Sequence, residues 1–160
     1  MAAGEVTKAA RKSGHAKRTR RAPDLLIMSR EDIERYEPRQ KEICISISDP
    51  FAHPARLSRR FESVLRLYFN DVVERGDPSD ILFALDHATA ICQFVDEASD
   101  IDRIVLHCNM GVSRSPGVAL GLCDCHGWAT AELERKYPGW NRLVRSVMRE
   151  LAVSQKTQSA

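Results

Sequence analysis

Residues 104–117 limit the possible folds more than any other stretch, because they read as a strand, a tight loop and a helix start. An apolar run at 104–106 leads into Cys108, and Pro116 stands where an apolar helical pattern begins. A loop that enters a helix leaves backbone N–H groups without intrahelical partners at the positive end of the helix dipole. Such a place binds anions, so we expect an anion-binding loop with Cys108 and Arg114 on its rim.

Strand-like and helix-like segments alternate along the rest of the chain. Strands are predicted at 24–28, 42–48, 63–69 and 103–107, and helices at 29–36, 79–98, 115–126, 130–137 and 141–153. This order predicts a single-domain α/β fold, with a central, mostly parallel sheet of about four to five strands and helices on both faces. Ligands of such sheets bind beyond the carboxyl ends of the strands, and Cys108 lies at one of those ends.

The charge distribution separates an N-terminal tail from the rest of the chain. Residues 1–22 contain seven lysines and arginines and one glutamate, although the whole chain has a net charge of only +2. A basic segment with few large apolar residues is expected to be disordered when free. It is either a solvated extension or a contact for an anionic partner. We assign residues 23–153 to the folded domain and expect residues 154–160 to be a frayed end.

The composition is typical of a protein in a reducing, intracellular compartment. No apolar run approaches the roughly 20 residues that span a bilayer, and the N-terminus lacks the apolar core of a signal peptide. The five cysteines do not have the spacing of a disulfide framework. We therefore expect a cytoplasmic protein, and nothing in the sequence predicts its oligomeric state.

The residue types in the anion-binding loop suit a phosphate monoester. A cysteine among unpaired N–H groups at a helix N-terminus is stabilised as a thiolate, which is a nucleophile without a general base. Gly111 permits a positive φ, so that successive amides converge on one point. Arg114 offers a planar fork to two oxygens, a contact that lysine does not reproduce. The Ser115 hydroxyl is placed to donate a hydrogen bond to the sulfur.

These residues form the string His-Cys-X5-Arg-Ser, from His107 to Ser115, which resembles the signature of the cysteine-dependent protein tyrosine and dual-specificity phosphatases. The segments Ile-Ser-Ile-Ser-Asp-Pro at 45–50 and Leu-Tyr-Phe-Asn-Asp at 67–71 resemble a bacterial branch of predicted protein tyrosine phosphatases. The order of elements from 24 to 153 is similar to that of small dual-specificity phosphatases. The resemblance implies a phosphatase domain that uses neither a cofactor nor a metal.

The resemblance also implies a two-step mechanism through a cysteinyl-phosphate on Cys108. The leaving group would take its proton from an aspartic acid about thirty to forty residues before the cysteine. Asp71, 37 residues ahead, fits best, and Asp77 and Asp80 are its rivals. The groups expected to bind the phosphoryl oxygens belong to Asn109, Met110, Gly111, Val112, Ser113 and Arg114.

Other residues have a structural and a functional interpretation. By resemblance, His107 would orient the loop, and Asn141 lies in a segment similar to one that packs under it. Cys44 is either a small buried side chain or a thiol that protects Cys108 as a disulfide. Cys123, Cys125 and His126 suggest a metal cluster, but their spacing on one helix does not let them converge, so no metal site is predicted.

The expected substrate is a phosphorylated protein or peptide, with phosphotyrosine first and phosphoserine or phosphothreonine also open. The first alternative is a phosphatase of a non-protein substrate, either a phosphoinositide or an RNA 5′ phosphate. The second is a catalytically silent module that binds phosphate groups. The walls formed by residues 49–60 and 70–80 would decide among substrates, and their conformation does not follow from the sequence.

Overall fold

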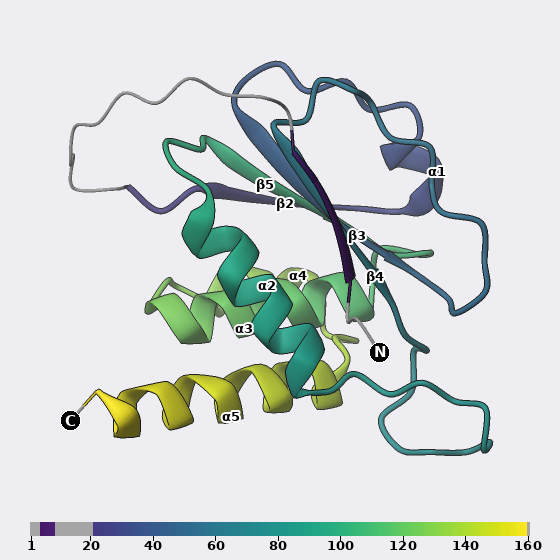
Figure 1. Ribbon diagram of the computed structural model, residues 1–160, viewed down its shortest axis with the longest axis vertical. Coiled ribbons are helices and arrows are strands. Elements are labelled where there is room, and N and C mark those ends of the chain that lie inside the picture. The colour runs from purple at the N-terminus through teal and green to yellow at the C-terminus, as the bar shows by residue number, and fades with distance from the viewer. Residues whose placement is uncertain (1–3, 9–20, 160) are drawn as a thin grey trace.

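The computed structural model describes residues 4–8 and 21–159, and Figure 1 shows how their elements are arranged. The strands are β1 (Gly4–Lys8), β2 (Asp24–Met28), β3 (Glu42–Ser48), β4 (Ser63–Tyr68) and β5 (Arg103–His107). The helices are α1 (Arg30–Ile33), α2 (Leu85–Glu97), α3 (Arg114–His126), α4 (Ala131–Lys136) and α5 (Arg142–Gln158).

The five strands form one sheet in the order β1-β4-β3-β5-β2. Strands β4, β3, β5 and β2 are parallel to their neighbours, and only the pairing of β1 with β4 is antiparallel. The predicted α/β fold with a mostly parallel sheet is confirmed. The carboxyl ends of β4, β3 and β5 lie side by side at one edge, which brings the loops after these strands together.

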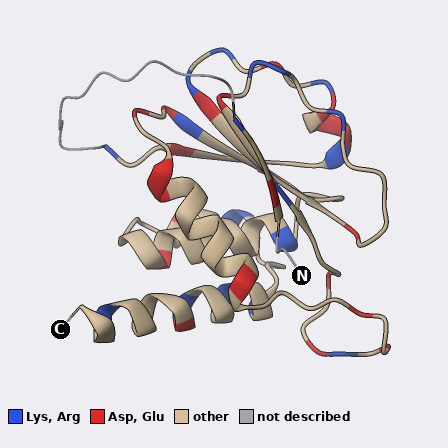
Figure 2. Ribbon diagram, in the orientation of Figure 1, with Lys and Arg blue, Asp and Glu red and all other residues tan. Residues whose placement is uncertain are grey.

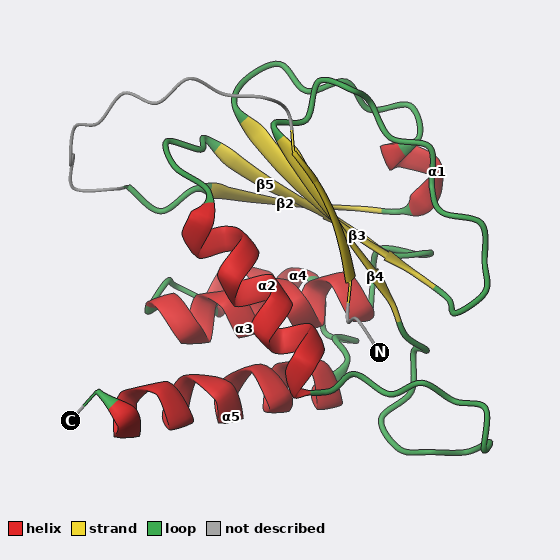
Figure 3. Ribbon diagram, in the orientation of Figure 1, coloured by secondary structure: helices red, strands yellow, loops and turns green. Residues whose placement is uncertain are grey.

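Both faces of the sheet are covered, as the alternation in β3 predicts. Helices α2 to α5 lie on one face, and α1 with the long loop after β3 lies on the other (Figures 1 and 3). Ile43, Ile45 and Ile47 belong to the core on the side of α2, α3 and α5, whereas Cys44 belongs to the core beneath α1. Each isoleucine is at most 1% exposed, and burying such a side chain contributes about 1.5–3 kcal/mol to folding.

The expectation of a disordered basic tail is wrong for residues 4–8, which form strand β1. Val6 pairs with Leu65 of β4, and Lys8 forms an ion pair with Glu97. Without β1, strand β4 would be an edge with unpaired backbone groups, and pairing satisfies them. Residues 9–20, which carry most of the basic charge, lie outside the described residues.

Helix α2 begins at Leu85 and not at Ser79 as predicted. The Ser79 hydroxyl and backbone N–H both donate to Asp77 Oδ1 and so complete a turn in place of a helix cap. Farther on, Ile81 lies outside any helix or strand and forms two hydrogen bonds with Asn70. Ser79 is of a residue type that caps helices, but here it stabilises a turn instead.

Helix α5 begins after Asn141, as predicted, but continues to Gln158 where a frayed end was expected from residue 154. The Asn141 side chain accepts a hydrogen bond from the Val144 N–H and so caps the helix. At the other end, Ser154 and Thr157 donate their hydroxyls to carbonyls four residues earlier. Their polar side chains thus bond within the helix, and no Gly or Pro interrupts it.

Candidate active site

Cys108 lies at the bottom of the anion-binding loop, residues 108–114, between the end of β5 and the start of α3. Its side chain is buried, with 2% of the residue exposed. The Gly111 N–H donates a hydrogen bond to Cys108 Sγ at 3.3 Å, and the Ser115 hydroxyl is 3.1 Å from the same sulfur. Two groups from the loop and from α3 therefore converge on the thiol, as the sequence predicted for Gly111 and Ser115.

The loop owes its tight path to Gly111, which has a φ of +71°. A Cβ at this position would lie 2.7 Å from the Met28 carbonyl carbon and 2.8 Å from the Ser29 nitrogen. The chain after β2 is close because the Arg30 N–H donates to the Asn109 carbonyl at 3.0 Å. The conformation and the packing each require glycine at this position.

Arg114 is 3% exposed, and its guanidinium is held from two neighbouring strand ends. Nη1 donates to Asp49 Oδ1 at 2.7 Å and to the Phe69 carbonyl at 2.8 Å. Nε is buried and has no hydrogen-bond partner among the described residues. A buried donor without a partner is unfavourable in a folded protein, and an oxygen anion at this place would satisfy it.

Asp49 is a site residue that we did not predict. It directly follows β3, next to the strand that ends at the anion-binding loop. Its carboxylate lies at the carboxyl end of a buried strand, and that position was a signal that could have identified it.

Asp71 is the predicted acid that the structure brings to the anion-binding loop. Its Oδ1 accepts hydrogen bonds from the Ser113 hydroxyl at 2.7 Å and from Asn141 Nδ2 at 2.9 Å. The Asn141 N–H in turn donates to the Ser113 carbonyl at 2.9 Å. Asp71, Ser113 and Asn141 thus form one cluster, and Oδ2 of Asp71 has no hydrogen-bond partner among residues 4–8 and 21–159.

The rival carboxylates cap turns in the 69–84 loop. Asp80 Oδ2 accepts hydrogen bonds from the Gly76 and Asp77 N–H groups. Hydrogen bonds from Ser79 to Asp77 lower the pKa of that carboxyl below its usual value, which holds it in the ionised form. Neither carboxylate forms a hydrogen bond or ion pair with the anion-binding loop within the described part of the chain.

His107 supports the loop from the sheet. It is fully buried, and its Nε2 is 2.6 Å from the hydroxyl of Ser46, its register partner on β3. Burial lowers the pKa of His107 to about 4, although a hydrogen bond to the Cys108 carbonyl acts in the opposite direction. The imidazole is therefore neutral at pH 7 and joins β5 to β3 directly below the cysteine.

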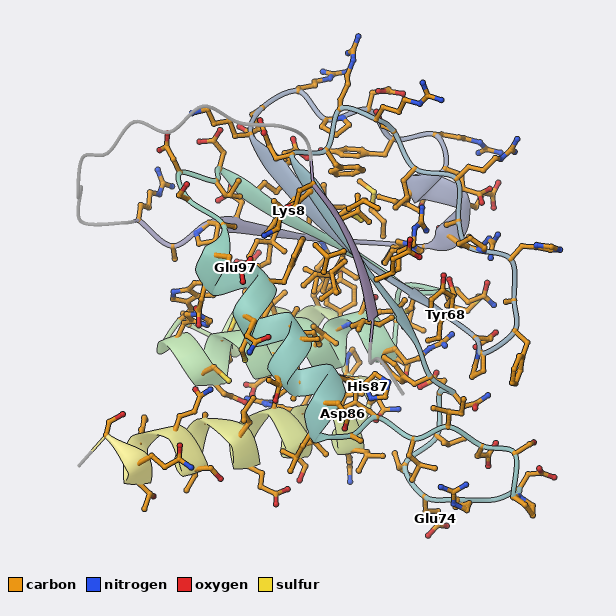
Figure 4. The ribbon with its side chains drawn as sticks, in the orientation of Figure 1. Lys8, Tyr68, Glu74, Asp86, His87 and Glu97 are labelled. Atoms are coloured by element: carbon orange, nitrogen blue, oxygen red, sulfur yellow. The ribbon has the colours of Figure 1, made fainter. Side chains whose placement is uncertain are left out.

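A second histidine, His87, joins the two ends of the 69–84 loop and was not predicted. Its Nδ1 accepts a hydrogen bond from the Ala84 N–H at 3.0 Å, and its ring also bonds the Tyr68 carbonyl (Figure 4). The ring stacks on Phe83 at 5.4 Å and lies 5.3 Å from Phe69. His87 therefore ties the start of the loop to its end, next to the carbonyl that holds Arg114.

Cys44 does not reach Cys108. It pairs in register with Val105, three residues before the catalytic candidate, and three residues of strand span about 10 Å. Disulfide geometry needs Cα atoms within about 7 Å. The two thiols also belong to the cores on opposite faces of the sheet. Cys44 is thus a small core side chain, and burial raises its pKa.

The Cys123–His126 segment spreads its side chains in different directions. His126 faces Asp96 at 3.2 Å and stacks on Trp128, whereas Cys125 is near the Met148 carbonyl of α5. Within the described ranges, no three His, Cys, Asp or Glu side chains are grouped as metal ligands. In the same ranges, no helix is both long and apolar enough for a membrane span.

A cavity of about 560 Å³ lies beside Asp71 and Ser113. Its walls come from the 69–84 loop, including Val73, and from the start of α5, including Trp140 and Arg142. The anion-binding loop therefore has open space next to it on the side of the carboxylate.

Comparison with known proteins identifies the fold. No protein-family model matches the chain, and no curated protein matches it either. Solved structures that share its architecture include PTPMT1 and Tk-PTP. PTPMT1 in complex with PI(5)P is 17% identical, with 86% of this chain and 95% of that chain covered and a TM-score of 0.56. Tk-PTP in the active form is 18% identical, with 80% and 89% covered and a TM-score of 0.53. The chain has the fold of these proteins.

Proposed function

We propose that the protein is a cysteine-dependent phosphatase that hydrolyses phosphate monoesters, with protein phosphotyrosine as its main substrate. The observation that carries this proposal is Arg114, a buried guanidinium whose Nε has no partner among the described residues. It stands in the loop that holds a buried thiol, and a backbone N–H already points at that thiol. A fixed cation, a nucleophile and convergent amides are the requirements of a site for phosphoryl transfer through cysteine.

In the first step, the Cys108 thiolate attacks phosphorus, so that a P–S bond forms while the P–O bond to the leaving group breaks. Arg114 and the N–H groups of residues 109–114 bind the three other phosphoryl oxygens as their charge develops. Asp71, protonated on Oδ2, gives its proton to the leaving oxygen. The hydrogen bonds from Ser113 and Asn141 to Oδ1 leave Oδ2 unoccupied for this transfer.

In the second step, the Asp71 carboxylate takes a proton from water, and the water oxygen attacks phosphorus. The P–S bond breaks, inorganic phosphate leaves, and the Cys108 thiolate is restored. The Ser115 hydroxyl, 3.1 Å from the sulfur, stabilises this thiolate. No atom in the cycle needs a metal ion or an organic cofactor.

Two observations support a substrate larger than phosphate itself. The cavity beside Asp71 gives the peptide around the phosphorylated residue room next to the proposed acid. PTPMT1, which shares the fold, was crystallised with PI(5)P, a ligand that carries a phosphate monoester. For this chain we favour a phosphorylated protein, because the 69–84 loop beside the site carries four carboxylates and one arginine, and this negative charge repels an anionic lipid surface.

The test is hydrolysis of para-nitrophenyl phosphate and of a phosphotyrosine peptide by the purified chain. We expect turnover that vanadate inhibits and a chelator leaves unchanged, and we expect Cys108→Ser to abolish it while the peptide still binds. Cys123→Ser, a second buried cysteine, is the matched control and should remain active. Turnover in Cys108→Ser would contradict the mechanism, and binding without turnover in the unaltered chain would identify a silent phospho-binding module.

A further inference from the structure

The loop that follows β3, residues 49–54, is fastened to the anion-binding loop at both ends. At its start, Asp49 accepts the hydrogen bond from Arg114 Nη1 at 2.7 Å. At its end, Arg30 Nη1 donates to the His53 carbonyl at 2.9 Å. The Arg30 N–H also binds the Asn109 carbonyl at 3.0 Å. These contacts fix the position of the short stretch between them relative to the candidate nucleophile.

Phe51 lies in this stretch, and neither its exposure nor its backbone suits a phenylalanine. It is 95% exposed, more than any other large apolar side chain in the described residues. Its φ is +64°, and the Ala52 N–H bonds the Asp49 carbonyl across it at 3.1 Å. With Pro50 before it, Phe51 occupies the third position of a tight turn, where a positive φ favours Gly or Asn.

A bulky residue at positive φ, with its ring in solvent, indicates a function outside folding. Backbone strain of this kind collects at binding and catalytic sites, where the surrounding structure holds it in place. Here the surrounding structure is the pair of contacts to Arg114 and Arg30. An exposed ring also has no core partner that would select an aromatic residue.

We propose that Phe51 is one wall of a subsite for the aryl group of the substrate, so that aryl phosphates, phosphotyrosine above all, are preferred to alkyl phosphates. This inference rests on the proposed phosphatase function. A phosphate bound at Arg114 would lie close to Asp49, because Arg114 Nη1 donates a hydrogen bond to the Asp49 carboxylate. Phe51 follows Asp49 by two residues, in the turn whose position these contacts fix. The substrate ring and the phenyl ring can then meet in an offset stack.

The surroundings favour an aromatic ring of a peptide over a membrane lipid. Two apolar side chains of the anion-binding loop, Met110 and Val112, are also exposed, at 70% and 53%. Acidic residues are nevertheless interspersed with them: Asp49 and Asp71 are exposed, and Figure 2 shows further acids on the 69–84 loop. A rim that is both apolar and acidic suits a single neutral ring better than an anionic bilayer.

The test compares a phosphotyrosine peptide with a phosphoserine peptide of otherwise identical sequence. Phe51→Ala should raise KM for the phosphotyrosine peptide about three- to tenfold with little change in kcat, because the lost stack contributes to binding. KM for the phosphoserine peptide should not change, and Phe51→Trp should restore the preference. Val153→Ala, at another exposed apolar position, 64% exposed and on α5, is the control.

Stability supplies a second, independent readout. Phe51→Gly should keep or raise Tm, because glycine accepts the positive φ, while it weakens phosphotyrosine binding as Phe51→Ala does. Equal changes for both peptides, or none, would overturn the inference, and so would an effect confined to phosphoinositide vesicles. Absence of turnover with every substrate in the unaltered chain would instead refute the proposed function.

Discussion

The anion-binding loop and the 69–84 loop form the two halves of the site, and they are built differently. In the first, Cys108 and Arg114 are nearly fully buried. The Cys108 sulfur is contacted by Gly111 and Ser115, a few positions away, and the Arg114 guanidinium is held by Asp49 and the Phe69 carbonyl. In the second, most residues are exposed, and Asp71 is held by the side chains of Ser113 and of Asn141, the residue that caps α5. Under the proposed mechanism, phosphate binding is thus organised in advance by buried groups, whereas proton transfer depends on an exposed carboxylate.

Under the proposed mechanism, this difference separates two kinds of defect. A change in the anion-binding loop removes stabilisation of the phosphoryl group and should slow hydrolysis of every substrate. A change in the 69–84 loop removes protonation of the leaving oxygen and should slow only those substrates whose leaving group needs a proton. The dependence on the leaving group therefore shows which half has been damaged.

The largest expected effect follows from Arg114→Lys. Lysine cannot reproduce the guanidinium fork, so we expect kcat to fall roughly 10³-fold for good and poor leaving groups alike. Steady-state kinetics with dinitrophenyl phosphate and phenyl phosphate measure this, and Arg59→Lys, at an exposed arginine, is the control. A loss limited to phenyl phosphate would contradict the assignment of separate roles to the anion-binding loop and the 69–84 loop.

Asp71→Asn should have a smaller and more selective effect. We expect kcat for phenyl phosphate to fall roughly 10²-fold, with less than about a tenfold loss for dinitrophenyl phosphate. Asp77→Asn is the matched control, because that carboxylate caps a turn in the same loop. If Asp77→Asn produced the selective loss, the acid would be wrongly assigned.

The smallest expected effect concerns stability and His107. Its pKa is lowered to about 4 in the folded state, so the unfolded chain binds more protons at pH values below about 6.5. The free energy of unfolding should therefore fall with pH from about 6.5 to about 4, by roughly 2 kcal/mol between pH 7 and pH 5 from this group. Urea unfolding at both pH values measures the change, and His107→Gln should flatten it.

The anion-binding loop was predictable because its parts are neighbours in sequence. Cys108, Gly111, Arg114 and Ser115 lie within eight residues, and their chemistry depends on one strand, one turn and one helix start. Strands β2 to β5 were predictable for the same reason, since alternation such as that along 42–48 reports burial on two faces. Even the rival acids could be named, although their hydrogen bonds could not.

What the sequence did not show depends on long-range pairing. Asp49 meets Arg114 across 65 residues and Ser46 meets His107 across 61, and both contacts follow only from the order of the strands. Strand β1 was missed because its charge suggested a tail, while its pairing depends on the free edge of β4. In the sequence, His87 looks like an ordinary residue of a helix. Its hydrogen bond with the Ala84 N–H depends on how the two ends of the 69–84 loop meet.

The central claim is that Cys108 carries the phosphoryl group between the two steps. Rapid acid quenching of the chain with ³²P-labelled phosphotyrosine peptide, followed by peptide mapping, tests it most directly. We predict one labelled peptide that contains Cys108, formed and lost at rates that account for turnover, and absent in Cys108→Ser. Full turnover with no labelled protein, or a label on another residue, would contradict the account.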